Sequence, residues 1–154
     1  MRIKILYLLS IAICLLMACK KDSQPTINPP ISTTPEIEFI SAAPTTVKQF
    51  SDSIKFTLKF TDGDGNVGDI SADSLSLFVI DNRNSSLVER YHIPPVAPLN
   101  SNIVVQGQFS VVLKNTILLN TNSTSETTNF SFKLKDRAGN FSNVVQSESI
   151  TITK

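Results

Sequence analysis

The sequence predicts an all-β protein, an immunoglobulin-like antiparallel β-sandwich of about seven strands. Several short segments alternate apolar and polar side chains, the pattern of a strand with one buried face. The clearest lies at residues 54–60, where one face collects Ile54, Phe56, Leu58 and Phe60. Turn residues separate these segments, and no segment shows sustained helical periodicity. This combination favours a sandwich over a βαβ fold.

The expected strands cover residues 36–40, 54–60, 75–80, 87–93, 103–114, 130–134 and 144–152. Prolines 94, 95 and 98 separate the fourth strand from the fifth. The chain has no Trp and no cysteine pair in this region, so the core Trp and disulfide of antibody domains are missing. The prediction therefore rests on strand number and spacing, and a small barrel is the alternative. We assign the domain to residues 36–154.

Residues 1–18 have the features of a secretory signal peptide. Arg2 and Lys4 form a positive start, and an apolar run follows from Ile5 to Leu16. A membrane-spanning helix needs roughly 20 apolar residues, so this run is too short to be a permanent anchor. A signal peptide that is removed after export fits it better.

The signal ends in Leu16-Met17-Ala18-Cys19, which resembles the lipobox of bacterial lipoproteins. The resemblance implies that the Cys19 thiol carries diacylglycerol and becomes the mature N-terminus, tethering the protein to a membrane. Two or three acyl chains anchor a protein far better than one. Cys14 lies inside the signal, so its removal leaves Cys19 without a cysteine partner.

Residues 19–35 comprise this lipidated cysteine and a flexible linker rich in Pro, Ser and Thr. Four prolines fall between residues 23 and 35, and such a stretch favours an extended, semi-stiff spacer. Its first residues, Lys20-Lys21-Asp22-Ser23, resemble the start of Bacteroidetes lipoproteins displayed at the cell surface; a solvated linker explains them nearly as well. We expect an outer-membrane lipoprotein, either periplasmic or exposed at the surface.

The charge balance argues against a nucleic-acid partner. Arg2 and Lys4 are the only charges in the first 18 residues, so the mature chain carries 12 basic and 13 acidic side chains. Nucleic-acid affinity comes mainly from neutralising phosphates, and the chain has no basic run for that purpose. The expected partners are the membrane, through the lipid, and a protein or glycan at the cell surface.

Two loops, residues 62–69 and residues 136–140, carry the candidate metal ligands. The first follows the expected strand at 54–60 and the second follows the expected strand at 130–134. In a sandwich of this type, both loops would lie at the same end of the domain. Oxygen ligands of this kind suit Ca²⁺, which takes six to eight of them. A turn built from Gly and Asp, without any ion, is the alternative. The candidate ligands are Asp62, Asp64, Asn66, Asp69, Asp136 and Asn140.

The first loop is not an EF-hand. Asp62, Asp64 and Asn66 match its first three ligand positions, but Val67 stands where that motif requires Gly. Helices are not expected on either side of the loop.

The same segments carry a family resemblance. FTDGDGNVG, LFVIDNR and KDRAGNFSN resemble Ig-like lipoproteins of unknown function found in Bacteroidetes, over most of residues 36–152. The resemblance implies an Ig-like fold and no established activity. Asp52-Ser53-Ile54 and Asp73-Ser74-Leu75 resemble the tripeptides that Bacteroidetes O-glycosylate, which makes Ser53 and Ser74 candidate glycosylation sites.

The sequence does not favour an enzyme. His92 is the only histidine, no partner for it is identifiable, and no Gly-Xaa-Ser-Xaa-Gly motif occurs. A carboxylate pair acting as a hydrolase is a distant alternative. We expect a non-catalytic binding or accessory module, with a Ca²⁺-stiffened structural spacer as the alternative. An exposed apolar or aromatic patch would favour the binding module.

Overall fold

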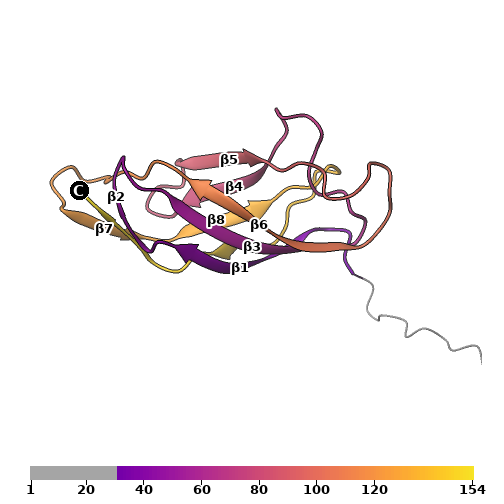
Figure 1. Cartoon of the computed structure of the whole chain (residues 1–154), viewed down its shortest axis with the longest axis horizontal. Coiled ribbons are helices and arrows are strands. Elements are labelled where there is room, and N and C mark those ends of the chain that lie inside the picture. Colours follow the sequence, from indigo (N-terminus) through magenta and orange to yellow (C-terminus); the bar gives the residue numbers. More distant parts are fainter. Residues whose placement is uncertain (1–30) are drawn as a thin grey trace, which may run out of the picture. The chain divides into compact units, whose positions relative to one another are not determined.

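Residues 31–154 are described by the structure, a computed structural model, and they contain ten strands and no helix. In chain order these are β1 (Glu36–Ala43), β2 (Thr46–Lys48), β3 (Ile54–Asp62), β4 (Leu75–Asp81), β5 (Val88–His92), β6 (Val105–Leu113), β7 (Ser125–Thr128), β8 (Phe130–Leu134), β9 (Val145–Gln146) and β10 (Ile150–Thr153). Figure 1 shows their arrangement.

The strands form three open sheets, with orders β1-β3-β6, β5-β4-β8-β9 and β2-β10-β7. Every pairing is antiparallel except that of β2 with β10. The predicted all-β, immunoglobulin-like sandwich is confirmed. Each sheet keeps two edges, which excludes a closed barrel for residues 31–154.

The strand count differs from the prediction of about seven. Two of the additional strands, β2 and β7, are short, and their sequences TVK and SETT carry too few apolar residues for alternation to reveal. The third comes from a break within residues 144–152. There the Ser147 hydroxyl accepts the N–H of Phe130 at 2.9 Å, and the chain then leaves β8 to pair with β7.

The core lies between the β1-β3-β6 sheet and the β5-β4-β8-β9 sheet. Phe56 of β3 packs against Phe130 and Phe132 of β8, with ring centroids 5.3 and 5.0 Å apart. The predicted inner face of β3 is confirmed, because Ile54, Phe56 and Leu58 are fully buried. Full burial of each such side chain stabilises the fold by about 1.5–3 kcal/mol.

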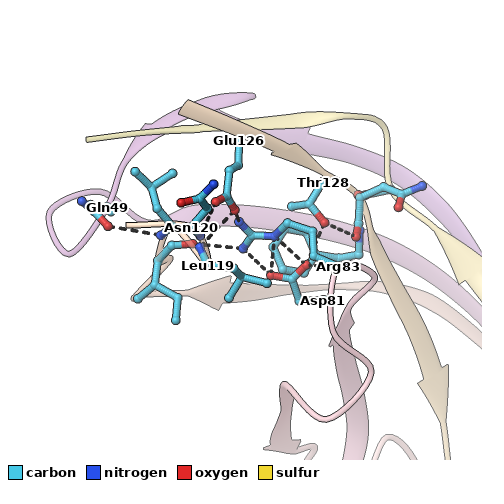
Figure 2. A network of polar contacts seen from close by, with 12 residues as sticks. Gln49, Asp81, Arg83, Leu119, Asn120, Glu126 and Thr128 are labelled. Atoms are coloured by element: carbon cyan, nitrogen blue, oxygen red, sulfur yellow. Dashed lines mark hydrogen bonds and ion pairs between the residues drawn. The ribbon is translucent and has the colours of Figure 1, made fainter. Parts of the chain in front are cut away.

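A polar network fastens the end of the domain that holds β7 (Figure 2). Arg83 binds the carboxylates of Asp81 and Glu126, and Thr128 donates its hydroxyl to Asp81 at 2.7 Å. Glu126 also accepts the backbone N–H groups of Leu119 and Asn120. The network therefore ties the turn after β4 to β7 and to the loop before it.

The predicted signal peptide, Cys19 and the linker up to Pro30 lie outside the described residues. Within residues 31–154, no helix is long and apolar enough to cross a membrane. The compact unit begins at Ile31, so residues 31–35, here called the joining segment, belong to the domain.

Candidate functional site

The two loops singled out in the sequence lie together, as predicted. The loop of residues 62–69 follows β3, and the loop of residues 136–140 lies just beyond β8. Val67 pairs with Asp136 as an isolated antiparallel bridge, and the N–H of Arg137 donates to the carbonyl oxygen of Asn66 at 3.1 Å.

Arg137 links the two loops through its side chain. Its guanidinium donates to the carbonyl oxygen of Gly68 at 2.7 Å, with longer contacts to the carbonyl oxygens of Val67 and Gly65. Sequence reasoning missed this role, because a surface arginine in a turn carries no signal of the backbone that it meets. The arginine is directed at carbonyl oxygens and makes no ion pair with Asp62 or Asp64.

Three of the predicted ligands gather in the first loop. Asp62 is fully buried, and its Oδ2 accepts the N–H of Asn66 at 2.9 Å. Asp64 Oδ2 accepts the Asn66 side-chain amide, also at 2.9 Å. Within the described residues, Asp62 Oδ1 and Asn66 Oδ1 are buried without a hydrogen-bond partner.

The Asp62 carboxyl lies in an unfavourable place for a negative charge. Burial, reinforced by the neighbouring Asp64 carboxylate, raises the pKa of Asp62 from 3.8 to about 6. The N–H of Asn66 opposes this rise without cancelling it.

The other predicted ligands have local partners of their own. Asp136 accepts the backbone and side-chain amides of Asn140, at 2.7 and 2.9 Å, one on each oxygen. Asp69 accepts the N–H of Ser71, which lowers the Asp69 pKa. In the part of the chain that the structure describes, no group of three or more His, Cys, Asp and Glu side chains is placed to hold a metal. Ca²⁺ binding stays a prediction.

The joining segment lies against this site. The N–H of Gly63 donates to the carbonyl oxygen of Ser32 at 2.8 Å. A Cβ on Gly63 would lie 2.5 Å from the carbonyl oxygen of Ile31, so glycine is required for this close approach. Thr33, Asp64 and Asn66 also line an open groove of about 670 Å³.

A second surface lies on the outer face of the β5-β4-β8-β9 sheet. Phe78 of β4 and Phe141 are 5.6 Å apart between ring centroids. The Lys133 ammonium lies 5.1 Å from the centre of the Phe78 ring and 4.7 Å from that of Phe141. Arg90 lies 5.5 Å from Phe78, and Lys135 lies 5.7 Å from Phe141. We call these five residues the aromatic–cationic face.

In the part of the chain that the structure describes, the cations of this face have no acidic partner. Among residues 31–154, no carboxylate lies within 4.0 Å of Arg90, Lys133 or Lys135. Sequence reasoning missed the face, although the position of Phe78 was a signal: it alternates with the buried Leu77 and Val79 and so points outward.

The remaining predicted positions lie elsewhere. Ser53 is exposed just before β3, and Ser74 is half-buried just before β4. His92 ends β5, and its Nδ1 lies 3.2 Å from the Ser74 carbonyl oxygen. O-glycosylation of Ser53 and Ser74 stays a prediction.

No protein-family model, curated protein or solved structure matches the chain.

Proposed function

We propose that this chain is an outer-membrane lipoprotein, anchored through Cys19, whose β-sandwich is a non-catalytic module that binds a polyanionic glycan at the cell surface. The aromatic–cationic face is the observation that supports the binding role. The anchor rests on the N-terminal sequence, in which the apolar run is too short to span a bilayer and ends at Cys19.

The charge of the face favours an anionic partner. Cation–π contacts hold its cations over two rings, so their positions are partly ordered before any ligand arrives. None is neutralised by a carboxylate of the described domain. An anionic ligand would therefore meet these cations without displacing an internal ion pair.

The placement of the face favours a glycan over an acidic peptide. Peptides that add to a sheet use the backbone groups of an edge strand. Here the ligand would meet side chains on the flat face of β4 and β8. Lys133 and Lys135 project from the same face about 7 Å apart along the chain, which suits a polymer with repeated charges.

Binding to dextran sulfate and polygalacturonate, with neutral dextran as the control polymer, tests the role of the face. We expect the full chain, purified in detergent, to bind both polyanions with an affinity that falls as salt rises. Changing Lys133 and Lys135 together to Gln should weaken binding about tenfold, because each exposed ion pair contributes about 0.7 kcal/mol.

The matched control changes Lys55 and Lys114 to Gln. Both are exposed and outside the aromatic–cationic face, and the net charge changes equally. Equal weakening in the two double variants would reduce the effect to overall charge and refute the proposal. Binding of an acidic peptide but of neither glycan would refute the choice of ligand.

The anchor is tested separately in intact cells. Cys19→Ala should release the protein from the membrane fraction, since the lipid is the proposed attachment. A variant that still sediments with membranes as the wild type does would refute the lipoprotein assignment.

A further inference from the structure

The loop of residues 62–69 contains two oxygen atoms that its own fold does not use. Asp62 is 0% exposed, and its Oδ1 is buried without a hydrogen-bond partner within the described domain. Asn66 Oδ1 is also buried without a hydrogen-bond partner among the described residues. A buried acceptor without a partner destabilises the folded state, and more so when it is charged, so two of them in one short loop require an explanation.

The turn alone does not provide that explanation. Gly65 and Gly68 supply the positive φ angles of 72° and 79° that the turn needs. Asp62 Oδ2 already binds the Asn66 N–H that closes the loop. A residue with a single acceptor would satisfy these local requirements, which leaves Asp62 Oδ1 without a structural role.

The missing partner has the properties of a cation. Two acidic side chains lie two residues apart, and within residues 31–154 neither forms an ion pair. The nearby guanidinium of Arg137 donates to the carbonyl oxygens of Gly65 and Gly68.

We propose that Asp62, Asp64 and Asn66 bind Ca²⁺ through their side-chain oxygens, and that binding fastens the loop to the joining segment. All three supply hard oxygen donors, which Ca²⁺ prefers, and two carboxylates balance its charge. Asp136 and Asn140 are not part of this site, because they satisfy each other.

Ca²⁺ binding would act on the joining segment because the loop contacts that segment directly. Gly63 stands between Asp62 and Asp64 and donates its N–H to Ser32. Thr33 lines the same groove as Asp64 and Asn66. A cation that fixes residues 62–66 therefore also fixes the place where the domain continues into the predicted linker. The proposal does not depend on the lipid anchor or on the glycan.

Calorimetric titration of the chelator-treated full chain, purified in detergent, tests the site with Ca²⁺ itself. We expect one site with a Kd on the order of 0.1–1 mM, the range of extracellular calcium modules. Calcium at 10 mM should raise the Tm by about 5 °C. Mg²⁺ should bind at least tenfold more weakly, because it needs a smaller, octahedral cage.

Asp62→Asn is the decisive variant. It keeps an oxygen that can accept the Asn66 N–H, so the loop should still close, but Ca²⁺ affinity should fall at least tenfold. Asp73→Asn makes the same chemical change at an exposed position and should bind Ca²⁺ like the wild type. If Asp62→Asn does not fold, Asp64→Asn, at a half-buried position, carries the same expectation.

Hydrogen exchange measures the effect on the joining segment. Ca²⁺ should slow exchange of the Gly63 amide, which donates to Ser32, in the wild type but not in Asp62→Asn. The absence of binding heat and of a Tm shift at 10 mM Ca²⁺ would overturn the site. Equal affinity for Mg²⁺, or equal losses in Asp62→Asn and Asp73→Asn, would overturn it as well. Binding without slower Gly63 exchange would overturn the coupling to the joining segment.

Discussion

Replacing Arg83 with leucine tests whether the network in Figure 2 holds the β7 end of the domain together. The side chains of Arg83 and Asp81 are 13% and 9% exposed, so the pair is largely withdrawn from water. Removing one partner of a buried ion pair typically costs about 3–5 kcal/mol, because the remaining charge is left uncompensated. The Thr128 hydroxyl still donates to Asp81 in the variant, so we expect a loss of about 3 kcal/mol.

The assay is urea unfolding of the full chain, followed by circular dichroism. Lys59→Met provides the matched control, since it breaks the Lys59–Glu38 pair, whose side chains are 39% and 64% exposed. Exposed pairs contribute about 0–1 kcal/mol, so this variant should lose far less. The Arg83→Leu/Asp81→Asn double variant should regain part of the loss, because it also removes the buried charge.

Equal losses in Arg83→Leu and Lys59→Met would refute the reasoning, since burial would then make no difference. A double variant less stable than Arg83→Leu would refute it as well. In that case Asp81 would act through contacts other than its charge.

Three further predictions concern pH, a strained residue and a close approach. Burial tends to raise the pKa of Asp81, but Arg83 and Thr128 outweigh this effect and hold that pKa below 3.8. The resulting contribution to stability is present above pH 3.8 and is lost as the pH falls through the lowered pKa. Urea unfolding at a series of pH values should therefore show that acid destabilises Arg83→Leu less steeply than the wild type. Phe50 is 71% exposed at a φ of 59°, so Phe50→Gly should stabilise the fold by about 1 kcal/mol, and an unchanged or lower Tm would contradict this. Gly63→Ala should cost about 2 kcal/mol, because the added Cβ meets two carbonyl oxygens of the joining segment. Gly107→Ala, whose Cβ meets only the side chain of Phe60, should cost less in the same melting experiment.

The strands that the sequence revealed are those with a buried face. Ile54, Phe56 and Leu58 alternate with polar residues because β3 lies on the core, and the structure buries all three. The strands β2 and β7 escaped prediction because three or four residues are too few for a period of two to stand out. Their place is set by pairing with β10, which is distant from β2 in sequence.

The two candidate sites also differ in how far the sequence alone could reveal them. The loop from Asp62 to Asn66 was visible because its ligands are neighbours in sequence. The aromatic–cationic face was not, because Arg90, Phe78 and Lys133 come from three strands and meet through cross-strand pairing. The burial of Asp62 was equally hidden, since a sequence does not state which acid in a polar turn faces the interior.

The sequence by itself determined the fold class, the position of the core face and the local spacing of the loop ligands, because alternation and turn chemistry act over a few residues. Tertiary structure alone decided which oxygens lack partners, which cations share a face and where the joining segment lies. These properties depend on contacts between residues far apart in the chain, such as Ser32 with Gly63 and Arg137 with Gly68, and no local pattern encodes them.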